Sequence, residues 1–311
     1  MKIIDAHTHF SNLSAFHDAA AASGVDFSYD GLVAEQARYN IVASVCMGLV
    51  ETAAGAFPDK DAPGIMFAQS PWCADVNQWV RQHWNDGAAQ LYTLPLHSDC
   101  PPNMYVCLGV NPNRLDDTAI ATLGQLLEAH TTQGRIVGFK IYAGYYHFNI
   151  NDPIYHPIYK LAAKHGLTVA IHTGDTYAES ALLEYSHPLA ADRLAVNFRD
   201  VNFMLCHMGD PWIMDACEVA YKNRNIFLDI SGLQAGDADV IAATEGRAVV
   251  MHHYQQGLAY LNAFEKVLFG TDWPLVPLGA YIEFCKKLVP VETYEDVFFN
   301  NAVRLFGLTG L

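Results

Sequence analysis

Short apolar runs alternate with longer amphipathic runs along this chain, and that rhythm limits its fold more than any other feature. Such apolar runs are typical of buried strands, and amphipathic runs are typical of helices. Their alternation favours a parallel sheet whose strands are joined by crossover helices. The strand-like runs lie at 2–7, 41–47, 104–110, 136–142, 167–172, 202–207, 226–230 and 266–271, and the clearest helical runs lie at 118–132, 153–165, 211–223, 247–264 and 280–288. Eight strand–helix units that close on themselves predict an α/β fold, the (β/α)₈ TIM barrel, over a single domain, 1–311.

The connection between the second and third strand-like runs is too long for a single crossover. The segment 51–103, between the second and third strand-like runs, far exceeds what a loop with its crossover helix needs. It carries Trp72, Trp79 and Trp84 without a shift in composition that would indicate a separate domain. We therefore predict a helical insertion between strands 2 and 3, packed on its own apolar contacts and capping the pocket.

Charge and composition narrow the classes of partner. The 311 residues include 33 acidic and 18 basic ones, and the net charge of −15 would repel nucleic acid. No uncharged apolar stretch approaches the roughly 20 residues that span a bilayer, and no secretory signal is visible. The seven cysteines are scattered and never spaced Cys-x-x-Cys, as expected of reduced thiols. We expect a cytoplasmic protein that binds a small molecule. The sequence leaves open whether it forms a homo-oligomer.

Several strand-like runs end in residues that bind metals. Asp-Ala-His-Thr-His places His7 and His9 on one side of an extended backbone, and two later runs end in His172 and His207. A fourth run ends in Asp272 within Gly-Thr-Asp-Trp-Pro. The strand ends of a barrel converge, and imidazole with carboxylate suits a divalent ion such as zinc. The pattern predicts a metalloenzyme.

Each of these residues also has a simpler interpretation when it is taken singly. A lone histidine is usually a hydrogen-bonded polar residue, and Asp272 before Trp-Pro could be a helix N-cap. Four strand ends with the same kind of residue are hard to explain by accident, because all four would meet at one end of the barrel. We therefore favour the interpretation that these strand-end residues are metal ligands.

Further polar and aromatic residues lie near the same strand ends. Lys140, in Val-Gly-Phe-Lys-Ile-Tyr, either pairs with a structural carboxylate or binds a carboxylate of the substrate. Its side chain faces either the barrel interior or the surface beneath the helices. Around the mouth, position alone predicts a substrate pocket lined by aromatic side chains, with ordinary loop packing as the alternative. The predicted lining residues are Tyr142, Tyr145, Tyr146 and Trp273.

Asp-Ala-His-Thr-His, the strand-end histidines, Gly-Thr-Asp-Trp-Pro and the closing Asn-Asn-Ala-Val-Arg-Leu-Phe-Gly-Leu together resemble the amidohydrolase superfamily over essentially the whole chain. The chain is most similar to the amidohydrolase-related branch, which includes aminocarboxymuconate-semialdehyde decarboxylase, resorcylate-type decarboxylases and lactone hydrolases. The resemblance implies that His7, His9, His172 and Asp272 bind one metal ion. It makes His207 either a catalytic histidine or a ligand of a second metal.

The resemblance adds a third interpretation of Lys140. In two-metal members of the superfamily a lysine on strand 4 is carboxylated and bridges the ions. Because this branch mostly resembles one-metal enzymes, we expect one divalent ion, zinc, and an unmodified Lys140. A second metal is left open.

These assignments predict a metal-dependent hydrolase that cleaves an amide, ester or lactone bond of a small molecule. A divalent cation lowers the pKa of bound water towards about 7, Asp272 can take its proton, and His207 can polarise the carbonyl. The same residues could instead protonate a carbon and release carbon dioxide, which makes a metal-dependent non-oxidative decarboxylase the alternative. A metal-free or inactive binding protein on the same barrel is a further alternative, but the complete set of ligands speaks against it.

Overall fold

Parallel strands form the wall of a nearly closed barrel in the computed structural model, which describes residues 1–9, 14–49, 65–66, 103–130 and 135–311. The strands follow one another in the order β1-β2-β4-β5-β6-β7-β8-β9. They are β1 (Ile3–Thr8), β2 (Ile41–Met47), β4 (Met104–Val110), β5 (Ile136–Ile141), β6 (Thr168–Ile171), β7 (Phe203–Leu205), β8 (Ile226–Asp229) and β9 (Val267–Leu268). The predicted TIM barrel is confirmed, with each strand within a few residues of its predicted run.

The first and last strands close the barrel with few contacts. Ala6 N–H donates to the Phe269 carbonyl over 3.0 Å, and Asp272 N–H donates to the His7 carbonyl over 2.9 Å. Beyond the paired residues of β9, Thr8 and Trp273 form an isolated parallel bridge. The main chain that carries Asp272 is therefore held directly beside the main chain that carries His7.

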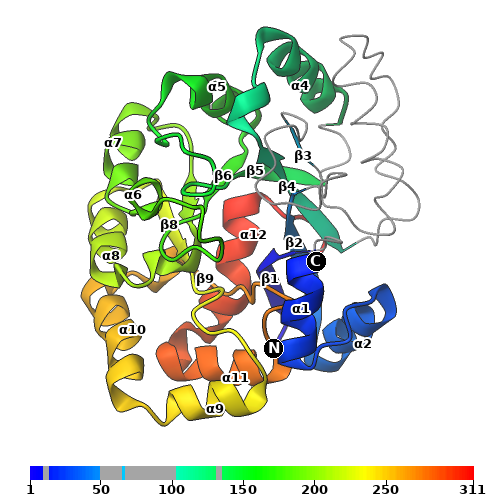
Figure 1. The fold of residues 1–311 in the computed structure, drawn as a ribbon, viewed down its shortest axis with the longest axis vertical. Helices are drawn as coiled ribbons and strands as arrows, with labels where there is room; N and C mark the ends of the chain where they lie inside the picture. The colour runs from blue at the N-terminus through cyan, green and yellow to red at the C-terminus, as the bar shows by residue number, and fades with distance from the viewer. Residues whose placement is uncertain (10–13, 50–64, 67–102, 131–134) are drawn as a thin grey trace.

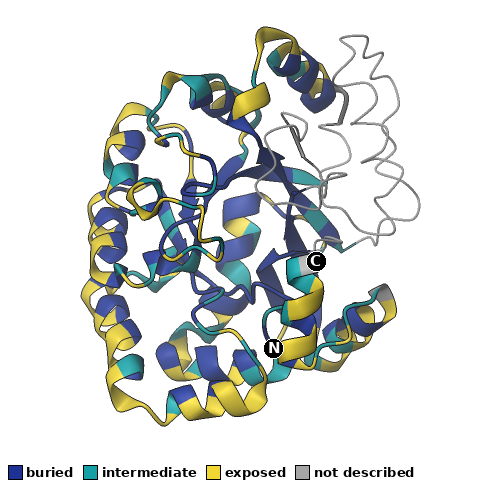
Figure 2. Ribbon diagram, viewed as in Figure 1, coloured by how far each residue is buried: buried dark blue, intermediate teal, exposed yellow. Residues whose placement is uncertain are grey.

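Most of the helices surround the strands as an outer ring (Figure 1). Their apolar sides face the strands and their polar sides face solvent, as the alternation of buried and exposed residues in Figure 2 shows. The helices are α1 (Ser14–Ser23), α2 (Tyr29–Tyr39), α4 (Asp117–His130), α5 (His156–His165), α6 (Leu183–Ser186), α7 (Ala190–Asn197), α8 (Ile213–Lys222), α9 (Ala238–Glu245), α10 (Ala248–Leu261), α11 (Leu278–Leu288) and α12 (Asn301–Phe306). No helix in this part of the chain is long and apolar enough to cross a membrane.

One end of the barrel is covered by α12. Its residues Ala302, Leu305 and Phe306 pack with buried side chains of the strands, and in Figure 1 the helix lies inside the ring. Thr168, the first residue of β6, donates a hydrogen bond from Oγ1 to the Leu305 carbonyl over 2.9 Å. Because α12 contacts the beginning of a strand, the opposite end, where the strands terminate, is left for a site.

Of segment 51–103, the structure describes Ile65, Met66 and Asn103. The first two form β3 (Ile65–Met66), which pairs antiparallel with β4 through Ile65 opposite Val110 and Met66 opposite Gly109. The rest of segment 51–103, where we predict a helical cap, lies outside the described residues, and that cap stays a prediction.

Candidate metal centre

Nitrogen and oxygen atoms from the first and last strands converge at the open end of the barrel. His7 Nε2 lies 3.4 Å from His9 Nε2 and 3.4 Å from Asp272 Oδ1, and His9 Nε2 lies 3.0 Å from the same oxygen. All three side chains are buried, and Asp272 Oδ1 accepts no well-oriented hydrogen bond from the described part of the chain. These donor atoms face one another around a common point rather than forming ordinary hydrogen-bonded pairs.

These separations suit a divalent ion. Ligand atoms about 2.0–2.1 Å from a tetrahedral zinc ion lie about 3.3 Å from one another, close to the 3.0–3.4 Å between the three donors here. Two imidazoles and a carboxylate are also ligand types that bind such an ion. The residues present therefore fit a divalent metal ion.

The two remaining strand-end histidines lie beside this set. The His207 ring is centred 4.9 Å from the His7 ring and 5.0 Å from the His172 ring. A ligand atom of His207 lies within 4.8 Å of ligand atoms of both His7 and Asp272. The structure thus gathers all five residues that the sequence analysis singled out, with His172 at the edge of the group next to His207.

Hydrogen bonds on the far side of each ring define which nitrogen is free. His7 Nδ1 lies 2.9 Å from Asp229 Oδ2, His207 Nδ1 lies 3.0 Å from the Ser231 carbonyl, and His172 Nε2 lies 2.8 Å from the Asp175 carbonyl. Carbonyl and carboxylate oxygens only accept, so each of these nitrogens carries the proton. The lone pairs consequently lie on His7 Nε2, His207 Nε2 and His172 Nδ1.

Burial disfavours the protonated, charged form of these imidazole rings. It lowers the pKa of His7 to about 3, with the nearby Lys140 adding to the effect, and it also lowers the pKa of His9 and His172. Burial alone would raise the pKa of Asp272, but His7 and His207 hold it well below its usual range. Neutral imidazoles and an ionised carboxylate are the protonation states in which these groups bind metals.

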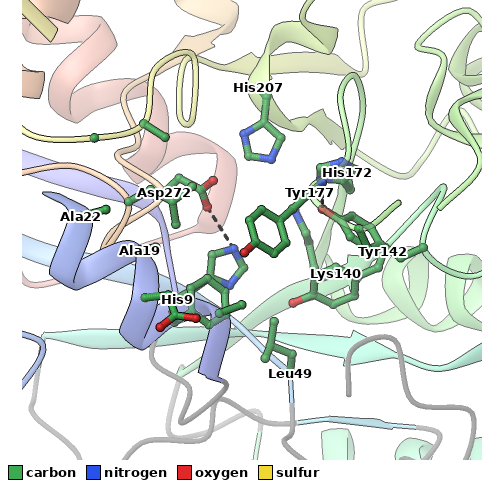
Figure 3. Close-up of a pocket in the computed structure, with 18 residues that line it drawn as sticks. His9, Ala19, Ala22, Leu49, Lys140, Tyr142, His172, Tyr177, His207 and Asp272 are labelled. Atoms are coloured by element: carbon green, nitrogen blue, oxygen red, sulfur yellow. Dashed lines mark hydrogen bonds and ion pairs between the residues drawn. The ribbon is translucent and has the colours of Figure 1, made fainter. Parts of the chain in front are cut away.

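A cavity of about 570 Å³ opens above the cluster and is the size of a small-molecule site. Figure 3 shows His9, Asp272, His207 and His172 along one part of it, with Lys140 and Tyr142 beside them. Most of the remaining lining is apolar or aromatic. It comes from Ala15, Phe16, Asp18, Ala19, Ala22, Leu49, Tyr145, Tyr177, Ala178, Ala235, Gly236 and Leu275.

Two of the four aromatic residues that we predicted around the mouth lie elsewhere. Tyr142 and Tyr145 line the cavity, whereas Tyr146 and Trp273 are buried and are not among its lining residues. Trp273 lies in the barrel wall opposite Thr8, and its ring packs on Phe27 with centroids 5.1 Å apart. The Trp273 ring is therefore enclosed in the wall and does not line the cavity that Asp272 enters.

Lys140 faces the cavity rather than the surface beneath the helices. It is 1% exposed, and its Nζ lies 3.0 Å from Cys206 Sγ and 5.4 Å from the centre of the Tyr142 ring. No ion pair between Lys140 and a carboxylate is found among the described residues. A structural salt bridge is therefore the least supported of its three interpretations.

Asp229 and Ser231 belong to the site and were missed by the sequence analysis. Asp229 is the last residue of β8, so the strand-end rule that identified the histidines applied to it equally. Asp175 also contacts the site, because its carbonyl lies 2.8 Å from His172 Nε2. Asp210, three residues after His207, accepts a hydrogen bond from Tyr254 on its carboxylate.

The family model described as Amidohydrolase matches residues 4–308. The chain therefore belongs to the amidohydrolase family, as the sequence motifs indicated. A search among curated proteins returned no match.

Solved structures share the fold at low sequence identity. The 2,6-dihydroxybenzoate decarboxylase from Rhizobium is 14% identical, with 100% of both chains covered and a TM-score of 0.65. A dihydroxybenzoic acid decarboxylase from Polaromonas sp. JS666, with bound manganese and the inhibitor 2-nitroresorcinol, is 13% identical over 100% of this chain and 98% of that one, with a TM-score of 0.61. A probable 2-pyrone-4,6-dicarboxylic acid hydrolase from Acinetobacter baumannii, with citric acid bound, is 15% identical over 99% and 100%, with a TM-score of 0.58.

Proposed function

We propose that this chain is a metal-dependent hydrolase of a small molecule, with His7, His9, His172 and Asp272 holding one divalent ion. The convergence of His7 Nε2, His9 Nε2 and Asp272 Oδ1 within 3.0–3.4 Å is the observation that carries the proposal. Zinc is the ion we expect from the ligand types. When bound, such an ion polarises a carbonyl group and lowers the pKa of water, which provides a nucleophile at neutral pH.

The protein's own groups would move the protons. Asp272 is ionised and can accept a proton from the attacking water, then return it to the leaving group. His207 presents its unprotonated Nε2 to the cavity because its Nδ1–H is bound to the Ser231 carbonyl. It can take a proton there and then donate a hydrogen bond to a developing oxyanion. The apolar lining would exclude other water molecules and strengthen these interactions.

A second candidate is non-oxidative decarboxylation of a small carboxylated substrate. The observation that favours it is Lys140, a buried cation in a largely apolar cavity without a carboxylate partner among the described residues. A substrate carboxylate could supply that partner. Its bond to the substrate carbon would break with release of carbon dioxide, and the electron pair left on that carbon would take up a proton brought by His207 or Asp272. The solved structures of similar fold include both decarboxylases and a probable hydrolase.

The deciding experiment combines metal analysis with product analysis. Protein purified without chelator should contain about one equivalent of divalent metal. It should then be screened against small lactones, esters, amides and aromatic acids, with acid release and carbon dioxide release recorded separately. Carbon dioxide release would replace the hydrolase proposal with the decarboxylase, and the absence of stoichiometric metal would support a metal-free binding protein.

A pair of variants ties the metal to the proposed ligands. His172→Ala should lose metal content and activity together. His252→Ala, which removes an exposed histidine of α10, should keep both. Full metal content and normal turnover in His172→Ala would contradict the ligand assignment.

A further inference from the structure

Asp229 connects His7, a metal-ligand candidate, with His207, the catalytic candidate. Its Oδ2 accepts the hydrogen bond from His7 Nδ1 over 2.9 Å, and its Oδ1 accepts from His207 N–H over 2.9 Å and from Ser231 N–H over 3.0 Å. The Ser231 hydroxyl also donates to Oδ1. One fully buried carboxylate therefore receives a donor from the metal-ligand candidate and another from the main chain of the catalytic candidate.

Ser231 extends this network to the second ring. Its Oγ lies 3.1 Å from His7 Nδ1 and 3.0 Å from His207 Nδ1, and its carbonyl lies 3.0 Å from His207 Nδ1. Because the Ser231 hydroxyl proton points to Asp229, its lone pairs face both rings. Both Nδ1 atoms are thus surrounded by acceptors alone, which holds the proton on Nδ1 of each ring.

The main chain at His207 also needs support. Its φ of 62° lies in the left-handed region, which is strained for a residue with a side chain. The hydrogen bond from His207 N–H to Asp229 stabilises this conformation, in which Nε2 reaches the cavity.

We infer that Asp229 is a positioning residue that sets both the tautomer of His7 and the placement of His207. Metal binding by His7 and proton transfer by His207 then both depend on Asp229. This inference rests on the proposed metal-dependent function. It assigns Asp229 no contact with substrate. Its consequence is that the hydrogen-bond acceptor which Asp229 offers to His7 Nδ1 determines whether His7 presents a lone pair or a proton to the metal position.

Asp229→Asn tests this directly, because it preserves shape and replaces one acceptor by an NH₂ donor. With the amide nitrogen at the Oδ1 position, it would face three donors; at the Oδ2 position, it faces one, His7 Nδ1–H. The second orientation loses fewer hydrogen bonds, and it forces the His7 proton from Nδ1 to Nε2. We therefore expect metal affinity to fall 10–100-fold, as is typical when the partner of a metal-binding histidine is lost.

The first measurement is made on metal-free protein, by ¹⁵N–¹H correlation spectra of the histidine rings. The unsubstituted protein should show His7 and His207 with the proton on Nδ1, and Asp229→Asn should show His7 with the proton on Nε2. A Nε2–H tautomer of His7 in the unsubstituted protein would overturn the inference without any variant. An unchanged His7 tautomer in a folded Asp229→Asn protein would do the same.

The second measurement is the affinity for Zn²⁺ of the same proteins, with Asp5→Asn as the matched control. Asp5 is equally buried, but its carboxylate binds the main-chain N–H groups of His7 and Thr271 and the Thr271 hydroxyl, not an imidazole. Asp5→Asn should lower stability while its His7 tautomer stays on Nδ1, and its Zn²⁺ affinity should fall less than that of Asp229→Asn. Equal losses of affinity would reduce Asp229 to a structural role.

Two provisions keep this test separate from the proposed function. Ser231→Ala removes the shared hydroxyl but leaves Asp229 in place, so His7 should keep its proton on Nδ1. This variant tests the inference even if Asp229→Asn does not fold, and loss of that His7 tautomer would overturn it. If the unsubstituted protein binds no metal, the proposed function fails. The tautomers in the metal-free spectra still decide the role of Asp229.

Discussion

Substitution of Gly232 by alanine should displace His207 and Asp272 in the candidate metal centre. Gly232 has a φ of +61°, and an added Cβ would lie 2.7 Å from His207 Nδ1 and 2.9 Å from Asp272 Oδ2. Ordinary contact begins near 3.4 Å, so the His207 ring would have to move by about 0.7 Å. Its 3.0 Å hydrogen bond to the Ser231 carbonyl would then be lost or badly stretched. The cost is about 1–3 kcal/mol for the backbone and about 1 kcal/mol for the hydrogen bond.

Gly166 provides the matched control for this prediction. It follows α5 with a φ of +66° and has open space where its Cβ would lie. Gly166→Ala therefore measures the backbone cost alone. Denaturant unfolding of the metal-free proteins should show Gly232→Ala about 1 kcal/mol less stable than Gly166→Ala, and Zn²⁺ titration should show at least about a tenfold loss of affinity in Gly232→Ala only. Equal stability and equal affinity in the two variants would refute the packing argument.

Three further predictions concern protonation and metal number. His207→Asn should keep most of the metal and lose rate; loss of one of two metals would instead place His207 among the ligands. Lys140→Ala should retain one metal, and added bicarbonate should restore nothing; activity that depends on bicarbonate during reconstitution would indicate a carboxylated lysine. Because burial lowers the pKa of His7, His9 and His172, the unfolded chain binds more protons than the folded one below the unfolded pKa of 6.5. Stability of the metal-free protein is then present above about pH 6.5 and is lost as the pH falls towards 3, although the raised pKa values of the buried Asp5 and the partly buried Asp210 oppose the trend. Urea unfolding at pH 7.5, 6.0 and 5.0 should show this decline, and a stability that rises on acidification would contradict it.

The strand pattern and the strand-end residues were predictable because both depend on local sequence. Burial on both faces of a parallel sheet makes its strands continuous apolar runs, so the positions of the strands could be located. Once the runs were placed in a barrel, the convergence of His7, His9, His172, His207 and Asp272 followed from topology, without knowledge of any side-chain contact.

The parts that could not be predicted depend on backbone conformations that sequence preference does not favour. His207 and Asp272 both have positive φ, 62° and 63°, although neither is glycine. These conformations re-aim the side chains after the regular part of β7 and β9 has ended. The inward direction of Lys140 likewise depends on register, since β5 places it beside Gly109 and Ala170.

The aromatic residues show the same limit. Tyr146 and Trp273 follow strand ends, as Tyr142 and Tyr145 do, and only the course of each loop separates lining from buried positions. Asp229 was missed for a different reason. It ends a strand, but its partner His7 lies 222 residues away, and nothing local to Asp229 indicates that contact.

The closure of the barrel between β1 and the chain after β9 sets the order in which the site can be completed during synthesis. The Asp5 carboxylate meets Thr271 across 266 residues, and Asp272 comes next. A ribosome would release His7 and His9 long before Asp272. In that interval the two histidines would lack the carboxylate that lies beside them in the folded barrel. On the proposed ligand assignment, metal capture at full affinity would follow the synthesis of Asp272, and the bound ion would hold together the two barrel strands that are most distant in sequence, β1 and β9.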